Sequence, residues 1–347
     1  MHFTSLTHKK SFLTLILLLL VSALSSCTPR TVRDPLTKSG FYFDTIITIT
    51  VYNTTDESLL DGCFAIADTY EQLFSATIPD SEISQINQSD GRPVTVSSDT
   101  LSLLQTGLKY CELSKGGFDI SIGKLSSLWN FTEENSSLPD ADAIHKAVST
   151  VDYRNILISG NEVTLKNPDT AIDLGAIAKG YIADQMKEYL NEHGVTEGTI
   201  NLGGNVLCIG PKSDGSNYRI GIQMPFEEQG AIAAVVEVKD QTVVSSGVYE
   251  RYMTVNDKLY HHILNPKTGY PYENGLLGVS IICPKSQDGD GLSTACFSLG
   301  LEDGMKLIES LSDTEAIFIT EDYEFHCSSG IGDTIPFEKG LAVNTVF

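Results

Sequence analysis

Basic residues are scarce in this 347-residue sequence. It holds 23 lysines and arginines against 45 aspartates and glutamates, which gives a formal net charge of −22 at neutral pH. A surface with this excess of negative charge repels nucleic acid and anionic lipid headgroups, so the composition argues against both as partners. Any site for an anionic ligand must therefore be locally positive or hold a cation. This makes Lys179, beside a glycine-rich segment, of particular interest.

Several common cofactor and metal motifs are also missing. The sequence has no C-x-x-C pair and no G-x-G-x-x-G near its glycine-rich segment. That segment is not a P-loop, because Tyr181 stands where G-x-x-x-x-G-K-[ST] needs its lysine. An EF-hand fails as well, since no glutamate falls at the twelfth position of a loop built on Asp288-Gly-Asp290. No internal period of repeat length is visible, which argues against a repeat array.

The cysteines form no pattern typical of a disulfide framework. Besides Cys27 there are six, far apart and flanked by apolar residues: Cys63, Cys111, Cys208, Cys283, Cys296 and Cys327. We expect them to be buried as small hydrophobic residues. An exported protein permits disulfides, but the spacing predicts no pairing.

No apolar run near the N-terminus is long enough to cross a membrane comfortably. Phe12–Leu24 has 13 residues and would reach only about 20 Å as a helix. Basic residues precede it and small residues follow, which is typical of a secretory signal peptide, predicted here over residues 1–26. Leu24-Ser-Ser-Cys27 resembles the bacterial lipobox, in which the cysteine is lipidated and becomes the first mature residue. The alternative is an ordinary secretory signal with an incidental cysteine.

These features predict an exported lipoprotein with a short tether. Residues 27–40 are polar and contain two prolines and a glycine, so we expect a linker from a palmitate-type lipid on Cys27 to a folded domain over residues 41–347. The expected location is the extracytoplasmic face of the bacterial cell membrane. The lipid, and not a membrane-spanning helix, would hold the protein there.

Apolar periodicity along the chain predicts a mixed architecture. Helices are expected over about residues 59–74, 99–113, 177–192, 292–299 and 302–311. Strands are expected over about residues 45–52, 151–158, 163–166, 198–209, 218–224, 231–238, 258–264, 277–283 and 315–320. Because strands and helices come in clusters and not in strict alternation, we predict an α+β fold with mixed or antiparallel sheets and packed helices in two lobes.

Three polar or glycine-rich segments carry the candidate chemistry: Asp173–Gly180, His261–Gly269 and Asp290–Thr294. In the last, a carboxylate and a hydroxyl four residues apart project from one face of a predicted helix start. Both are hard oxygen ligands of the kind that Mg²⁺ accepts in small number while it keeps water and phosphate oxygens. The alternative is an Asp290 that caps the helix and a Thr294 on the surface.

The other two segments supply a cation and a base. Small residues enter a helix at Gly175–Gly180, where backbone amides attract an anion and Lys179 in the first turn could reach a phosphate. Asp173 either accepts hydrogen bonds from a ligand or caps this helix. The pair His261-His262 ends a strand, so one imidazole points inward and one outward. A histidine beside a metal-bound phosphoryl group is a workable general base, whereas a tandem pair on a strand cannot share one Zn²⁺.

Seven segments, in order along nearly all of the chain after the linker, resemble those of the FAD:protein FMN transferases, the ApbE family of lipoproteins. Besides the three candidate segments they are Ser81–Asn87, Gly117–Gly123 with Leu128-Trp129, Asn201–Gly204 and Ser245–Gly247. No single motif decides the resemblance. Their shared order makes it specific.

The resemblance implies that FAD lies in a central cleft between the two lobes and that Mg²⁺ bridges its pyrophosphate. It implies that the ion is held by Asp290, Thr294 and the backbone carbonyl of Ala176. A Ser or Thr hydroxyl of an exported acceptor flavoprotein would attack the FMN phosphorus and AMP would leave, with His262 as the general base and Asp290 as the second catalytic residue. The residues implied to line the cofactor are Gly117, Phe118, Asp119, Asp173, Lys179 and Leu264.

Two positions depart from the family's pattern. Many relatives carry Met-Gly-Thr where this chain has Phe43-Asp44-Thr45, and many place a tyrosine over the isoalloxazine where it has Thr77. Both Phe43 and Thr77 are therefore expected to contact the flavin and to alter its affinity. Two alternatives to transfer stay open: an FAD pyrophosphatase that releases FMN and AMP, and a lipoprotein that only binds flavin or a cation.

Overall fold

The structure is a computed structural model that describes residues 34–131, 137–228 and 230–340. The predicted signal peptide, Cys27 and most of the linker lie outside the described residues. From Pro35 onward the described chain forms one compact unit. No helix within these described ranges is both long and apolar enough to cross a membrane. The division of this unit into two lobes stays a prediction.

The largest sheet has eight strands, paired in the order β1-β2-β6-β7-β10-β13-β14-β15 and antiparallel throughout. Every residue of its strand β13 is buried, as its continuous apolar sequence predicts. The bounds are β1 Leu36–Tyr42, β2 Thr45–Val51, β6 Gly198–Leu202, β7 Asn205–Ile209, β10 Thr242–Gly247, β13 Leu276–Cys283, β14 Glu315–Thr320 and β15 Phe325–Cys327.

Three smaller antiparallel sheets complete the described strands. One pairs β16 (Phe337–Lys339), β9 (Ile232–Val238) and β8 (Tyr218–Gln223), and most of its buried residues belong to the main apolar core. A second pairs β3 (Val94–Thr95), β5 (Glu162–Leu165) and β4 (Ile156–Ser159). The third is the hairpin of β11 (Tyr252–Val255) and β12 (Lys258–His261).

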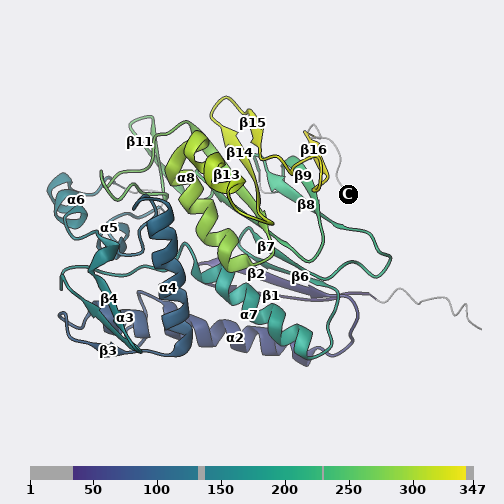
Figure 1. Cartoon of the computed structure of the whole chain (residues 1–347), viewed down its shortest axis with the longest axis horizontal. Coiled ribbons are helices and arrows are strands. Elements are labelled where there is room, and N and C mark those ends of the chain that lie inside the picture. Colours follow the sequence, from purple (N-terminus) through teal and green to yellow (C-terminus); the bar gives the residue numbers. More distant parts are fainter. Residues whose placement is uncertain (1–33, 132–136, 229, 341–347) are drawn as a thin grey trace, which may run out of the picture. The chain divides into compact units, whose positions relative to one another are not determined.

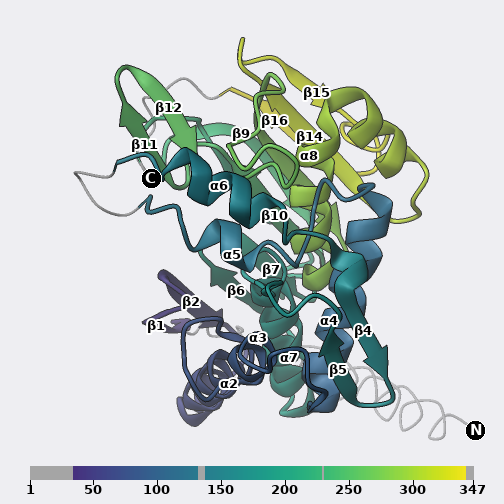
Figure 2. The ribbon, with the colours of Figure 1, turned by 90° about the vertical axis from the view of Figure 1, so that its left-hand side faces the viewer.

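The described helices surround these sheets. Figure 1 shows α2, α7 and α8 along the large sheet, where α7 packs on β6 and β7, and α8 packs on β10 and β13. Figure 2 shows the β4–β5 hairpin beside α4. The bounds are α2 Ser58–Phe74, α3 Glu82–Asn87, α4 Ser98–Leu113, α5 Gly123–Ser126, α6 Ala141–Val148, the 3₁₀ helix η1 Tyr153–Asn155, α7 Ala178–Glu192 and α8 Ser286–Glu309.

The contact between α7 and α8 decides where the candidate site lies. Gly180, in the first turn of α7, faces the start of α8 so closely that a methyl group in its place would lie 2.2 Å from the carbonyl oxygen of Ser286. Only a residue without Cβ allows this approach. It brings two of the candidate segments, 110 residues apart in sequence, into direct contact.

The predicted α+β class is confirmed, and the helices expected at 99–113 and 177–192 lie within one residue of α4 and α7. The domain boundary at residue 41 is wrong, because Leu36–Tyr42 forms the edge strand β1. This strand is mostly polar and contains Gly40, so its sequence looks like a linker. The single strand expected over 198–209 is a hairpin, turned at Gly203 and Gly204 with φ of 60° and 92°.

The last helices begin earlier than expected. We predicted separate helices over 292–299 and 302–311, whereas α8 runs from Ser286 to Glu309 with non-helical dihedral angles at Gly300 (φ 79°, ψ 177°). The break is therefore where the sequence put it, but the first half starts six residues earlier. Glycines at 289 and 291 obscured that start, because glycine weakens a helix pattern. Glycine is needed at these two positions because α8 packs there against Val244 and Tyr110 without room for a side chain.

The expectation for the cysteines is confirmed at five of the six described positions. Cys63, Cys111, Cys208, Cys283 and Cys296 are buried, and Cys327 is half-buried. All six thiols are free.

Candidate functional site

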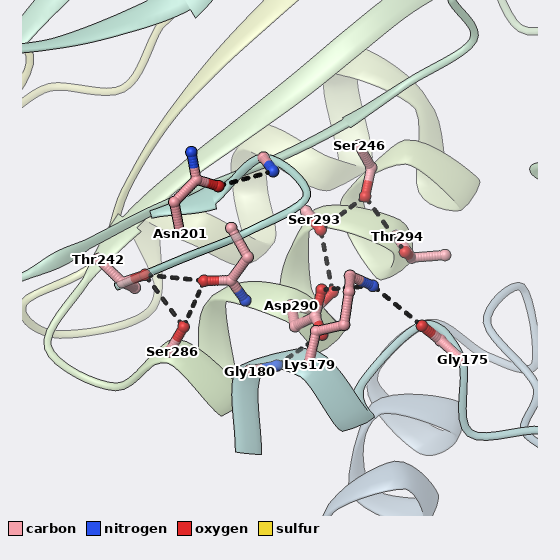
Figure 3. Close-up of polar contacts among 12 residues, drawn as sticks. Gly175, Lys179, Gly180, Asn201, Thr242, Ser246, Ser286, Asp290, Ser293 and Thr294 are labelled. Carbon is pink, nitrogen blue, oxygen red and sulfur yellow. Dashed lines mark hydrogen bonds and ion pairs between the residues drawn. The ribbon is translucent and has the colours of Figure 1, made fainter. Parts of the chain in front are cut away.

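Asp290 lies where α7 meets α8 and is 5% exposed. Its Oδ2 accepts a hydrogen bond from the backbone amide of Gly180 at 2.9 Å, and its Oδ1 lies 3.8 Å from Nζ of Lys179 (Figure 3). Burial raises the pKa of Asp290, while the Lys179 charge and the Gly180 amide act in the opposite direction. The carboxylate is thus costly to bury and has a cation and an amide that reduce the cost.

The carbonyl of Ala176 precedes α7, which begins at Ala178. The first amides of a helix have no acceptor within the helix, and that of Gly180, the third residue of α7, donates to Asp290. Among the described residues no hydrogen bond to the Ala176 carbonyl is found. A carbonyl without a donor is an oxygen ligand that a hard cation can use.

Thr294 lies one helical turn beyond Asp290 and is half-buried against β10. Its Oγ1 is 3.3 Å from Oγ of Ser246, which in turn is 2.7 Å from Oγ of Ser293. Ser293 donates to the backbone carbonyl of Asp290 at 2.9 Å. Figure 3 shows these hydroxyls above the carboxylate.

The alternative of a capping aspartate is wrong. α8 begins at Ser286, four residues before Asp290, and its first amides are capped from α7 by Asp184. The two carboxylate oxygens of Asp184 accept from the amides of Ser286 and Gln287, each at 2.9 Å. Asp290 therefore does not cap α8.

The donor set fits Mg²⁺ better than softer metals. One carboxylate, one hydroxyl and one carbonyl are all oxygen ligands, and Mg²⁺ is usually held by few protein groups plus water and phosphate. In the described ranges no group of three or more His, Cys, Asp and Glu side chains forms a metal cluster. A zinc-type site of histidines and cysteines is therefore not seen in that part of the chain.

Lys179 and Asp173 order the turn before α7. Nζ of Lys179 donates to the Gly175 carbonyl at 3.1 Å, and Asp173 Oδ1 accepts from the Gly175 amide at 2.9 Å. The other oxygen of Asp173 accepts from the hydroxyl of Ser126 at 2.7 Å. Asp173 thus orders the turn but does not cap α7, which begins at Ala178 and has no side-chain cap; its contact with a ligand stays a prediction. Lys179 lies in the first turn of α7 as predicted.

His262 follows β12 and is half-buried. Its backbone amide and its Nδ1 lie 3.0 Å and 3.2 Å from the Arg251 carbonyl. A carbonyl can only accept, so Nδ1 carries the proton and Nε2 keeps a free lone pair. Burial lowers the pKa of His262 to about 3, and the charges of Arg251 and Lys179 add to the effect. The ring is therefore neutral at physiological pH, with Nε2 able to accept a proton.

His261 has the structural role expected of one member of the pair. It is 5% exposed, its Nε2 lies 2.9 Å from the Tyr272 carbonyl, and its Nδ1 accepts from the amide of Ile263 at 3.3 Å. His261 is buried and His262 is half-buried, so the two imidazoles differ in exposure, although His262 is not fully outward as expected.

The sequence profile of the ApbE family matches residues 43–318, which is most of the chain. An FAD:protein FMN transferase of Klebsiella pneumoniae is 36% identical over 277 residues, covering 79% of this chain and 86% of the relative. One of Treponema pallidum is 31% identical over 340 residues, covering 92% and 94%. The chain belongs to the ApbE family.

Solved ApbE structures have the same fold. The ApbE protein of Thermotoga maritima superposes with a TM-score of 0.79 at 30% identity, covering 85% of this chain and 97% of that one. The flavin transferase ApbE of Vibrio cholerae gives a TM-score of 0.76 at 25% identity, with the same coverage of both chains. The predicted ApbE-like fold is confirmed.

Three of the flavin positions that the ApbE resemblance implied lie after α4. Gly117 has no room for a side chain, since a methyl group there would lie 2.5 Å from Oγ of Ser298, and its carbonyl accepts from the Tyr272 hydroxyl at 2.9 Å. Phe118 is 4% exposed. Asp119 accepts from the amide and hydroxyl of Ser121 and, at 3.1 Å, from the amide of Tyr153. Burial raises the pKa of Asp119.

These hydrogen bonds show that Asp119 stabilises the local backbone around residues 119–121 and that of Tyr153. None of the hydrogen bonds described for the Gly117–Asp119 segment involves Lys179, His262 or Asp290. Their role in binding flavin stays a prediction.

The remaining predicted positions lie on other elements. Leu264 is 7% exposed and belongs to a small apolar cluster with Leu125 and Trp129. Phe43 occupies the β1–β2 turn with φ of 52°, followed by Asp44 at 58°, and its amide donates to Glu71 at 3.0 Å. Thr77 is exposed, with its hydroxyl 3.0 Å from that of Ser75. Their contact with flavin is likewise untested by this geometry.

Sequence reasoning missed three residues of the site. Ser246 lies in a segment that supported the family resemblance but received no role. Arg251 acts through its carbonyl, which no side-chain pattern reveals. Asp184 reads as an ordinary polar position on α7 and shows its role only where it caps α8.

Proposed function

We propose that this protein is an FAD:protein FMN transferase that requires Mg²⁺. It transfers the FMN part of FAD to a Ser or Thr hydroxyl of an exported flavoprotein and releases AMP. The observation that carries the proposal is the buried carboxylate of Asp290, which contacts Lys179 and the Gly180 amide at the N-terminal end of α7. The names of the Klebsiella and Treponema relatives support the same reaction.

Asp290, Thr294 and the Ala176 carbonyl would hold the metal ion. When bound, Mg²⁺ neutralises the charge that develops on a pyrophosphate during phosphoryl transfer. Two of the ligands lie on α8 and the third lies in the turn before α7. The two helices pack without room for a side chain at Gly180, so the positions of the ligands are set before FAD arrives.

Lys179 supplies the local positive charge that this acidic protein needs to bind an anion. Its ammonium group is at the N-terminal end of α7, where the helix dipole also favours negative charge. Binding of a pyrophosphate there opposes the positive charges that depress the pKa of His262, so that pKa rises when FAD binds.

His262 would accept the proton of the attacking hydroxyl at Nε2. The bond that forms joins the acceptor oxygen to the FMN phosphorus, and the bond that breaks joins this phosphorus to the bridging oxygen that leaves with AMP. The Arg251 carbonyl fixes the tautomer, because it holds the proton on Nδ1. If water takes the place of the protein hydroxyl, the same groups yield FMN and AMP.

Mass spectrometry of a co-expressed acceptor tests the proposal directly. The acceptor should gain the mass of FMN in a reaction that needs FAD and Mg²⁺, and AMP should appear in equal amount. Free FMN and AMP with or without the acceptor would assign a pyrophosphatase instead. Flavin binding without either product would assign a non-catalytic lipoprotein.

We also propose that lipid on Cys27 tethers the protein to the extracytoplasmic face of the cell membrane. The basic segment, short apolar run and Leu24–Cys27 sequence support this location. Labelled palmitate should be incorporated into the wild-type protein recovered from the membrane fraction, and not into the Cys27→Ala variant. Equal labelling of both would refute the tether.

A further inference from the structure

Ser246, in β10, contacts two hydroxyls of α8 at once. Its Oγ is 2.7 Å from Oγ of Ser293 and 3.3 Å from Oγ1 of Thr294 (Figure 3). Each of these hydroxyls has one proton to donate, so the order of donors and acceptors can be worked out.

The order runs in one direction only. Ser293 uses its proton on the backbone carbonyl of Asp290, at 2.9 Å, so it can only accept from Ser246. Ser246 has then used its own proton on Ser293 and can only accept from Thr294. The chain of donors is therefore Thr294 to Ser246 to Ser293 to the carbonyl of Asp290.

The direction matters for the chemistry of Thr294. A hydroxyl that donates its proton to Ser246 keeps both lone pairs of Oγ1 unshared. A hydroxyl free to rotate would present its proton to a cation for part of the time, which is repulsive. The network that starts at Thr294 also ends on Asp290, so it links two proposed metal ligands through atoms that do not bind the metal.

We propose that Ser246 is a positioning residue for the metal site: it accepts the hydroxyl proton of Thr294 and so aims the lone pairs of Thr294 at the cation. The proposal rests on the proposed function, in which Thr294 and Asp290 bind Mg²⁺. Groups that orient a metal ligand without touching the metal typically contribute about 10- to 100-fold to metal affinity.

Ser245 provides a matched control in the same strand. Like Ser246 it is half-buried, and its hydroxyl makes a hydrogen bond of similar length, 2.8 Å, to Ser280 of β13. Neighbouring residues of a strand point to opposite faces of the sheet, so Ser245 faces away from α8. Ser245→Ala removes one Ser–Ser hydrogen bond without touching Thr294.

The test measures binding of Mn²⁺ alone, as a probe of the Mg²⁺ site, by electron paramagnetic resonance with the whole protein. Ser246→Ala should raise the Kd for Mn²⁺ by about 10-fold or more, and Ser246→Cys, similar in size but a weak hydrogen-bonding group, should do the same. Ser245→Ala should bind as the wild type does, and Ser246→Thr, which keeps the hydroxyl, should retain most of the affinity. Excess Mg²⁺ should restore FMN transfer by Ser246→Ala.

Three results would overturn the inference. Wild-type affinity in both Ser246→Ala and Ser246→Cys, with transfer intact, would refute the role of Ser246 and leave the proposed function standing. Equal losses in Ser245→Ala and Ser246→Ala would show that packing of β10, and not the contact with Thr294, is responsible. Failure of the wild-type protein to bind Mn²⁺ or Mg²⁺ would refute both the inference and the metal-dependent function.

Discussion

The amide of Gly180 donates to the carboxylate of Asp290 at 2.9 Å, across the contact between α7 and α8. This hydrogen bond does two things at once. It partly satisfies a buried carboxylate, and it gives an acceptor to an amide in the first turn of α7 that has none within the helix.

Asp290→Asn should abolish Mg²⁺ binding and slow FMN transfer by about 100-fold or more, because metal stabilisation of a phosphoryl-transfer transition state is worth several kcal/mol. The fold should persist, because burial raises the pKa of Asp290 and makes its charge costly, and the neutral asparagine avoids this cost. Calorimetry of Mg²⁺ binding and circular dichroism check the two parts. The control is Asp288→Asn. Asp288 lies on α8 like Asp290, but its carboxylate accepts a hydrogen bond from Tyr110 of α4, so this variant should keep its metal affinity.

Gly180→Ala should destabilise the protein by about 1–3 kcal/mol, because the added methyl group overlaps the carbonyl of Ser286 and forces the helices apart. The same shift should lengthen the contact of the amide with Asp290 and weaken Mg²⁺ binding. Urea unfolding and metal titration measure both effects. Wild-type values for both quantities would mean that α7 and α8 are less closely packed than we describe.

His262 should titrate far below the ordinary histidine value, with a pKa of about 3, so that it stays neutral between pH 5 and 8. NMR titration of the imidazole in the protein without FAD checks this. Adding FAD should raise the pKa, and Arg251→Gln should raise it as well, since one depressing charge is removed. His262→Ala should slow transfer strongly while FAD binding stays near normal; a loss confined to FAD binding would instead give His262 a positioning role.

Asp184 should make stability fall as the pH rises. Burial raises its pKa to about 6 in the folded protein, above the value near 3.9 in an unfolded chain. The folded state therefore binds the proton of Asp184 more tightly than the unfolded state does. The contribution of this proton to the free energy of unfolding is largest below about pH 4 and is lost as the pH rises through 6. The unfolding free energy of the wild type, minus that of Asp184→Asn, should fall between pH 4 and 7. A difference that stays constant or rises over this pH range would contradict the raised pKa of Asp184.

Local spacing predicted the chemistry of single segments but not how they meet. Asp290 and Thr294 could be paired because a helix places residues four apart on one face, and Lys179 could be placed in a first turn by the same rule. The contact of Gly180 with Asp290 joins positions 110 residues apart, and Ser246 reaches α8 from a strand. Such contacts depend on how sheets and helices pack, which local periodicity does not encode.

The edge of the sheet was the least predictable part of the fold. β1 is polar because an edge strand has solvent on one side, so its sequence is hard to distinguish from a tether. The β1–β2 turn has positive φ at Phe43 and Asp44, and a phenylalanine is not typical of the first central position of such a turn. The family resemblance marked Phe43-Asp44-Thr45 as a departure from the family's pattern, whereas the turn itself came from the structure.

The break at Gly300 divides α8 into two mechanical parts. The first part carries Asp290, Ser293 and Thr294, and the second packs its own residues, such as Ile308, into the core. Because the helical dihedral angles are interrupted at Gly300, the second part is not a straight continuation of the first. The residues that follow Gly300 are thus a natural attachment point for a spectroscopic label that leaves Asp290, Ser293 and Thr294 undisturbed.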